Sequence, residues 1–202
     1  MLICISGQSG SGKTTTACIV ADSLNLPVLH LDNIGELVWQ QADIKGILTA
    51  RFGESILDDS GKIDIKKLGE IIFAKDADAH RDFHNSVVMP EVIKIVDSEI
   101  EKHNGNIILD FKLLPAMKYW EMADFRIHLK SQAEMRLARM AADDKTDCAY
   151  LLNRDAAAPV ITLTPPKIDY LIVNEGTKQQ LTELVHAGIA KIKAKQIGTS
   201  NG

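Results

Sequence analysis

Short apolar runs alternate with segments of helical periodicity along most of the chain. The first run, "LICIS" (residues 2–6), ends in glycines, and residues 12–25 follow it with apolar positions at helical spacing. Four further runs have the length and composition of buried strands, at 27–31, 106–110, 124–129 and 169–174. We expect helices at about 131–142, 146–157 and 177–194. The alternation predicts an α/β fold with a parallel five-stranded sheet that helices cover on both faces.

The interval 50–104 interrupts this alternation. A turn-rich stretch, "GESILDDSGKID", precedes a pattern that predicts two or three helices, with Pro90 near the start of the last one and Asn104-Gly105 at its end. We interpret the interval as a helical insertion that supplies a substrate surface. Residues 1–202 then form a single domain, because a chain of this length can build one sizeable core.

Composition and charge narrow the classes of partner. Charged residues make up 25% of the chain and the net charge is −4, with no basic block or stripe, so we expect neither a nucleic-acid nor a membrane partner. The three cysteines cannot all pair and lack metal-binding spacing. Cys4 and Cys18 are predicted to be small buried hydrophobic residues. With no basic leader before the first strand, these features favour a reduced, cytoplasmic protein.

The glycine-rich stretch after the first strand has the pattern of a phosphate-binding loop. Residues 7–14 match G-x-x-x-x-G-K-[ST] and lie between a predicted strand and a predicted helix. The glycines let successive backbone N–H groups point at an anion, and the helix N-terminus adds partial positive charge. We expect Lys13 at the β- and γ-phosphates and the Thr14 hydroxyl on Mg²⁺. The predicted nucleotide site includes Gly10, Ser11, Gly12, Lys13, Thr14 and Thr15.

Two aspartates follow predicted strands, where ligands of open parallel sheets bind. Asp32 ends the second strand pattern and Asp110 ends the third. Either one alone could be a helix N-cap. Together with the phosphate-binding loop, they suggest that Asp32 orients or deprotonates an acceptor hydroxyl and that Asp110 has an outer-sphere metal or a substrate role. We expect His30, two residues before Asp32, to be a packed or hydrogen-bonded partner rather than a base.

A cationic helix face follows the fourth strand. Gln132, Arg136 and Arg139 fall on one face of the helix expected at 131–142. Such a face can close over ATP and stabilise charge on the transferring phosphoryl group, although a solvated charged face would have the same pattern. We interpret residues 131–157 as a lid, with Arg154 as a further candidate.

With these motifs in place, the chain resembles the dephospho-coenzyme A kinase family over nearly its full length. The phosphate-binding loop and Asp32 match the start of the family, in which the second strand ends in D-x-D. "FGESILDDSGKIDIKKLGEIIF" is similar to FG-x-x-I…G-x-I-D-R-x-x-L…VF, and "DFKLL" to D-x-P-L-L. "QAEMRLAR" resembles the lid motif Q-x-x-R-L-x-x-R, and "DYLIVNEG" resembles A-D-x-V-I-x-N-x-G.

The resemblance implies a nucleoside-monophosphate-kinase-like core with a coenzyme-binding insertion and a lid. The implied reaction moves the γ-phosphoryl group of ATP, as its Mg²⁺ complex, to the ribose 3′-hydroxyl of dephospho-coenzyme A. Asp32 would approach that hydroxyl, and Arg136 would face the phosphates with Arg139 close by. Asn174 and Gly176 would lie near the adenine of ATP.

The chain departs from the family pattern mainly on the substrate side. His30 replaces the first aspartate of D-x-D, and Ile65 replaces the arginine of G-x-I-D-R. Met89 stands where the family has histidine, and Lys112 where it has proline. The lid motif is also one residue longer between Gln132 and its first arginine. Arg81 and Lys112 are candidates to replace the missing cation, so the expected substrate residues are Asp32, Arg81 and Asp110.

Two alternative functions are compatible with the same motifs. One is a kinase of this build that phosphorylates a nucleotide or another small hydroxyl compound, with the substituted positions forming a different acceptor pocket. The other is a P-loop protein that binds nucleotide and regulates a partner. The second alternative is disfavoured by the intact Lys13, Thr14, Asp32 and Asp110, because a binding module has no need of an acceptor-side carboxylate.

Overall fold

The computed structural model describes residues 1–144, 156 and 165–200. The chain divides into two compact units. The core unit comprises Met1–His30, His103–Thr146 and Ala158–Gly202, and the helical unit comprises Leu31–Lys102 with Asp147–Ala157. The helix expected at 146–157 and the candidate Arg154 lie outside the described residues, apart from position 156.

The core unit contains the expected five-stranded parallel sheet, so the predicted fold class is confirmed. The strands are β1 (Leu2–Gly7), β2 (Val28–His30), β3 (Ile107–Asp110), β4 (Phe125–Lys130) and β5 (Tyr170–Val173). Their order is β2-β3-β1-β4-β5, and every neighbouring pair is parallel. The central strand β1 is buried at all six positions, which explains why "LICIS" is a continuous apolar run rather than an alternating one.

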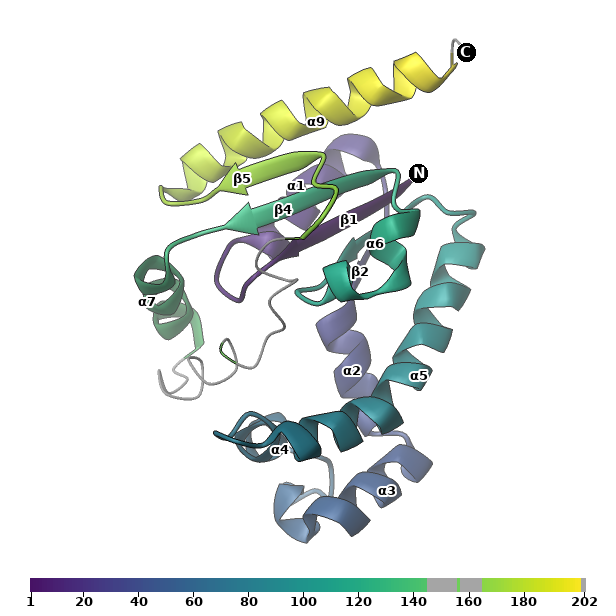
Figure 1. Ribbon diagram of the computed structural model, residues 1–202, viewed down its shortest axis with the longest axis vertical. Helices are drawn as coiled ribbons and strands as arrows, with labels where there is room; N and C mark the ends of the chain where they lie inside the picture. Colours follow the sequence, from purple (N-terminus) through teal and green to yellow (C-terminus); the bar gives the residue numbers. More distant parts are fainter. Residues whose placement is uncertain (145–155, 157–164, 201–202) are drawn as a thin grey trace. The chain divides into compact units, whose positions relative to one another are not determined.

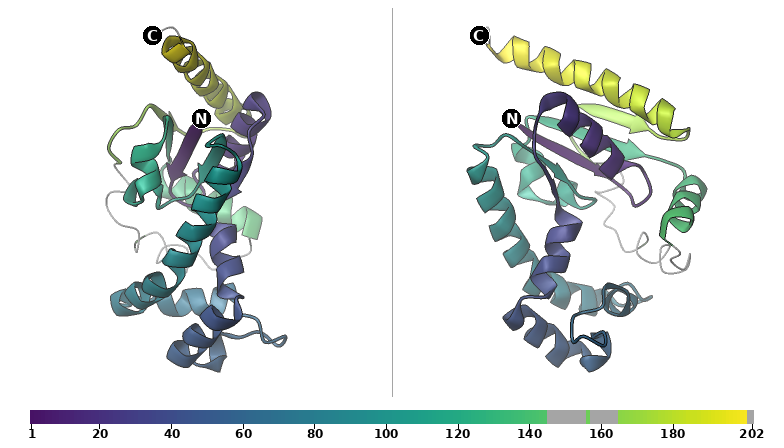
Figure 2. Two further views of the ribbon diagram at one scale, coloured as in Figure 1. Left: turned by 90° about the vertical axis from the view of Figure 1, so that its right-hand side faces the viewer. Right: turned by 180° about the vertical axis from the view of Figure 1, so that it is seen from behind.

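Helices cover both faces of this sheet. Helices α1 (Lys13–Leu24) and α9 (Lys178–Ser200) pack against each other on one face, and the 3₁₀ helix η2 (Leu114–Ala116) and α6 (Lys118–Met122) lie on the other (Figures 1 and 2). Helix α7 (Ala133–Asp144) follows β4. The buried cluster between the sheet, α1 and α9 includes Ile3, Ile5, Val20, Ile127, Leu129, Ile172 and Val185.

The helical unit consists of α2 (Leu31–Trp39), α3 (Ala42–Phe52), the 3₁₀ helix η1 (Glu54–Ile56), α4 (Ile65–Ile72) and α5 (Asp78–Lys102). Helices α2 and α5 pack together, and Trp39 Nε1 donates a 2.9 Å hydrogen bond to His84 Nε2 between them. Asp64 caps α4 by accepting hydrogen bonds from the backbone of Lys66 and Lys67. The aspartate of the "GKID" motif therefore has a structural task in this unit.

Two element boundaries differ from the expectation. Strand β2 ends at His30, and Asp32 lies in the first turn of α2 rather than at the end of a strand. His30 is the last residue of β2 to pair with β3, and the buried Leu31, Ile34 and Val38 follow at helical spacing. The helical unit consequently starts at Leu31, whereas the expected insertion starts at residue 50.

Pro90 lies in the middle of α5 and not near its start, contrary to the sequence prediction. A proline removes one backbone hydrogen bond and usually kinks a helix. In α5, the buried Val88, Val92 and Val96 surround it at helical spacing. Their burial stabilises a helix that continues through the proline.

The predicted burial is correct for Cys4 and wrong for Cys18. The Cys4 thiol donates a 3.4 Å hydrogen bond to the carbonyl of Tyr119, and burial raises its pKa to about 12. Cys18 is exposed, because Ala17 and Val20 occupy the buried face of α1. Cys148 lies outside the described residues. Across the described part of the chain, every helix is too short or too polar to traverse a bilayer.

Candidate active site

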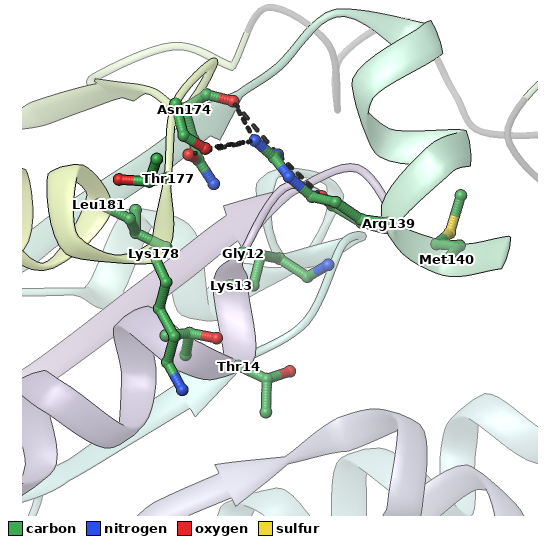
Figure 3. Close-up of a pocket in the computed structure, with 12 residues that line it drawn as sticks. Gly12, Lys13, Thr14, Arg139, Met140, Asn174, Thr177, Lys178 and Leu181 are labelled. Atoms are coloured by element: carbon green, nitrogen blue, oxygen red, sulfur yellow. Dashed lines mark hydrogen bonds between the residues drawn. The ribbon is translucent and has the colours of Figure 1, made fainter. Parts of the chain in front are cut away.

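A cavity of about 460 Å³ lies in the core unit where the glycine-rich loop, α7 and the start of α9 converge (Figure 3). This volume is within the range of small-molecule sites. The lining combines the predicted loop residues and lid arginine with four residues that the sequence reasoning missed, Met140, Thr177, Lys178 and Leu181. The full lining is Gly10, Gly12, Lys13, Thr14, Thr15, Arg139, Met140, Asn174, Gly176, Thr177, Lys178 and Leu181.

The loop has a backbone that requires glycine at two positions. Gly10 and Gly12 have φ angles of +72° and +97°. A Cβ atom on Gly12 would lie 2.8 Å from Asn174 Nδ2 and 2.9 Å from a methyl group of Leu181. A Cβ atom on Gly10 would lie 2.6 Å from the carbonyl oxygen of Arg136. The loop is therefore closely packed against α7 and the segment after β5, and α1 begins directly behind it at Lys13.

Polar groups of the loop match the requirements of a bound phosphate. Lys13 is 9% exposed, and its Nζ donates a 3.2 Å hydrogen bond to the carbonyl of Gln8. The hydroxyl groups of Ser9 and Ser11 are buried and have no hydrogen-bond partner among the described residues. Neither serine lines the cavity. Lys13 and the N-terminus of α1 do line it, and together they form a site suited to an anion.

Asp110 lies at the end of β3 and is 5% exposed. Its Oδ2 atom accepts hydrogen bonds from Thr14 Oγ1 at 3.2 Å and from His30 Nδ1 at 2.9 Å. Its Oδ1 atom is buried without a hydrogen-bond partner in the described structure. His30 is thus a hydrogen-bonded partner, as the sequence analysis expected, with Nδ1 committed to Asp110.

The oxygen atoms of Thr14 and Asp110 are ligands of the kind that Mg²⁺ prefers. In the described residues, however, no three His, Cys, Asp or Glu side chains gather into a site that could hold a metal by themselves. A metal at this position would take further ligands from nucleotide phosphates, as is usual for Mg²⁺ in kinases. The donor set therefore fits a metal that arrives with the nucleotide.

Both predicted arginines of α7 contact the phosphate-binding loop. Arg136 is 5% exposed and donates to the carbonyl oxygens of Ser9, at 3.1 Å, and Ser131, at 3.3 Å. Arg139 donates to the carbonyl oxygens of Gly10, at 3.4 Å, and Asn174, at 3.2 Å (Figure 3). This face of α7 is therefore part of the site, and the alternative of a solvated charged face does not apply to it.

The residues predicted near the adenine lie at the same cavity. Asn174 is 4% exposed, and its Nδ2 donates a 2.9 Å hydrogen bond to the carbonyl of Ser11. Arg139 also donates to the carbonyl oxygen of Gly176, at 3.2 Å. One arginine thus connects the loop before α1 with the segment after β5, although these segments are far apart in the sequence.

The remaining predicted residues, Asp32 and Arg81, belong to the helical unit. Asp32 has an exposed side chain in the first turn of α2. Arg81 donates a 3.2 Å hydrogen bond to the carbonyl of Ile72 and forms an ion pair with Asp78. The guanidinium group of Arg81 therefore already has an anionic partner within its own helix.

Comparisons with known proteins identify the family of the chain. The family model described as Dephospho-CoA kinase matches residues 1–180. The dephospho-CoA kinase of Shouchella clausii is 26% identical over 198 residues, which cover 95% of this chain and 98% of that protein. The enzyme of Bacillus licheniformis is 28% identical over 191 residues, 92% and 94% of the two chains.

A solved structure shares the fold. The crystal structure of TT1252 from Thermus thermophilus superimposes with a TM-score of 0.73 at 22% identity, covering 96% of this chain and 97% of that one. The matched residues 1–180 include the phosphate-binding loop, Asp110, both arginines and Asn174. The chain belongs to the dephospho-CoA kinase family.

Proposed function

We propose that this chain catalyses the reaction of its family, ATP-dependent phosphorylation of dephospho-CoA to CoA, at the cavity of the core unit. The observation that carries the proposal is the convergence of Lys13, Arg139 and Asn174 around the glycine-rich loop. This convergence combines an anion site with a pocket large enough for a nucleotide. The cysteine content favours the reducing cytoplasm as the compartment of the reaction.

The donor side binds the phosphates of ATP. On binding, Lys13 would exchange the Gln8 carbonyl for a phosphate oxygen, which its flexible stem allows. Arg136 and Arg139 hold two guanidinium groups against the loop and offset phosphate charge there. Asn174 lies on the far side of the cavity from Thr14 (Figure 3), Gly176 also lines the cavity, and both would contact the adenine.

The acceptor side requires a group that takes up a proton. As the 3′-hydroxyl oxygen of the ribose bonds to the γ-phosphorus, the bond from that phosphorus to the β,γ-bridging oxygen breaks, and ADP leaves with the electron pair. The hydroxyl proton passes to the carboxylate of Asp32, whose exposed position leaves it accessible to substrate. Asp32 is thus the general base in this proposal.

Thr14 and Asp110 would hold the Mg²⁺ of the nucleotide, Thr14 directly and Asp110 through a bound water. The metal would supply charge neutralisation on the phosphates. The unpartnered Oδ1 atom of Asp110 supports this assignment, because a buried carboxylate oxygen without a donor is otherwise costly.

The proposal is tested by the substitution Asp32→Asn. Turnover with dephospho-CoA, followed as CoA formation, should fall by about 10²–10⁴-fold, the contribution of a general base, while ATP binding by calorimetry stays close to wild type. Asp43→Asn, at an exposed position in the first turn of α3, is the matched control and should retain turnover. Near-wild-type turnover of Asp32→Asn would show that another group accepts the proton.

A further inference from the structure

His30 and Asp110 are register partners in the parallel strands β2 and β3. Residues paired in this way point to the same face of a sheet, and their side chains are neighbours. The His30 Nδ1 atom lies 2.9 Å from Asp110 Oδ2. We propose that His30 is a positioning residue for phosphoryl transfer, which acts by holding the Asp110 carboxylate in one orientation toward the metal of the nucleotide. This inference rests on the function proposed above.

The hydrogen-bond roles in this contact follow from the chemistry of the two groups. An ionised carboxylate can only accept, so the proton of the contact is on Nδ1 of His30. Thr14 Oγ1 donates to the same oxygen, Oδ2. Two donors therefore converge on one oxygen of Asp110, and none in the described structure reaches the other. This asymmetry fixes the rotation of the carboxylate and reserves Oδ1 for a ligand.

The orientation of the Asp110 carboxylate depends on whether residue 30 is a histidine or an aspartate. The family pattern places an aspartate here, and an aspartate cannot donate a hydrogen bond to Asp110. Two adjacent carboxylates repel unless a cation lies between them. A histidine supplies the donor directly, as an outer-shell partner that orients a metal-binding group. In this chain, Asp110 is therefore positioned before the metal nucleotide binds.

Three substitutions separate positioning from a structural role. His30→Asn keeps an N–H donor near the Nδ1 position, His30→Leu removes the donor, and His30→Asp restores the residue of the family pattern. His186→Asn, at an exposed position on α9, is the matched control. The readouts are the Mn²⁺ affinity of the complex with a non-hydrolysable ATP analogue, measured by electron paramagnetic resonance, the kcat and KM for CoA formation, and the melting temperature.

We expect His30→Leu to lose about 10–100-fold in Mn²⁺ affinity and in kcat, the usual cost of an outer-shell substitution, with little change in the KM for ATP. His30→Asn and His186→Asn should stay close to wild type in both. His30→Asp should have a lower melting temperature without metal and regain it when the Mn²⁺ nucleotide is added, because the metal separates the two carboxylates.

Two outcomes would overturn the inference. One is a His30→Leu variant with unchanged Mn²⁺ affinity and kcat. The other is a set of three variants whose melting temperatures fall alike while metal affinity stays constant, as a purely structural residue would give. Failure of the proposed function is a separate result: wild-type protein would form no CoA, while the Mn²⁺ affinities of the variants would still follow the expected order.

Discussion

Three cationic side chains gather at the glycine-rich loop of a chain that is acidic as a whole. The net charge is −4, yet Lys13, Arg136 and Arg139 all lie at one loop. Two of the three are nearly buried, so water screens their attraction for an anion less than at an open surface. An anion bound at this loop would therefore depend on these individual residues and not on the overall charge of the chain.

Substitution of Lys13 tests this dependence at the scale of one side chain. Lys13→Ala should abolish measurable CoA formation and sharply weaken ATP binding, because the ammonium group nearest the phosphates is removed. Lys193→Ala, at an exposed position on α9, should leave both unchanged. Calorimetric titration with ATP and a coupled assay for ADP give the two measurements. Wild-type ATP affinity of Lys13→Ala would contradict the placement of the phosphates at this loop.

The sequence predicts the residues of the site unevenly. The phosphate-binding loop is one continuous motif, so its residues could be identified directly. Met140 and Leu181 escaped prediction because they reach the cavity only through the packing of α7 and α9 against the loop. The weak signal that could have found Leu181 is its place in the first turn of the helix that follows the N-x-G segment. The exposure of Cys18 was also missed. Apolar residues occupy both faces of this turn of α1, so the sequence pattern does not show which face packs against the sheet.

At the scale of elements, the close approach of the loop to its neighbours decides which glycines are needed. Gly12→Ala combines a strained φ with contacts below 3 Å to Asn174 and Leu181, and should destabilise the chain by about 1–3 kcal/mol. Gly46→Ala is the matched control within α3, where a Cβ meets no described atom within 4 Å; it should stabilise by about 0.5–1 kcal/mol. Urea denaturation compares the two variants. Equal effects would contradict the tight packing of the loop.

The contact between α2 and α5 should make the helical unit sensitive to acid. Burial lowers the pKa of His84, and the hydrogen bond with Asn85 offsets this only in part. In the unfolded chain, His84 takes up a proton near the ordinary histidine pKa of about 6.5, whereas in the folded state its imidazole stays neutral at that pH. Stability is therefore full above that pH and falls as the pH decreases toward the folded pKa.

The substitution His84→Leu should remove this part of the pH dependence. Urea midpoints at pH 7.5 and 5.5, followed by Trp39 fluorescence in a Trp120→Phe background, measure it. The difference between the two midpoints should shrink in His84→Leu and persist in a His186→Gln control, whose histidine is exposed. An unchanged difference in His84→Leu would assign the acid sensitivity to other groups.

Element boundaries were less predictable than element types. The sequence correctly indicates five parallel strands, because buried strands and helices have different periods. It does not show that β2 stops at His30, since the end of a strand depends on which residue of β3 is available for pairing. The sequence prediction also misplaces Pro90. Proline prefers the first turn of a helix, but the burial of valines on both sides of Pro90 stabilises α5 as one continuous helix.

At the scale of the whole molecule, the proposed ATP site and the proposed acceptor residue belong to different units. The residues that line the cavity all belong to the core unit, and the family model spans all of them except Leu181. The proposed acceptor residue Asp32 belongs to the helical unit, which also contains two of the departures from the family pattern, Met89 and the exposed Ile65. The phosphate-binding loop is one contiguous motif and could be predicted directly, whereas Asn174 and Gly176 lie far along the chain and were predicted from the resemblance to the family. The acceptor is proposed from the family and is tested by a direct measurement.

The central claim is tested most directly by ADP release from Mg²⁺-ATP in the presence of single acceptors, with the product identified by mass spectrometry. The panel contains dephospho-CoA, each common nucleoside monophosphate and no acceptor. The account predicts ADP release with dephospho-CoA alone and a product with the mass of CoA. ADP release with a nucleoside monophosphate instead, or with no acceptor in the panel while ATP still binds, would contradict it.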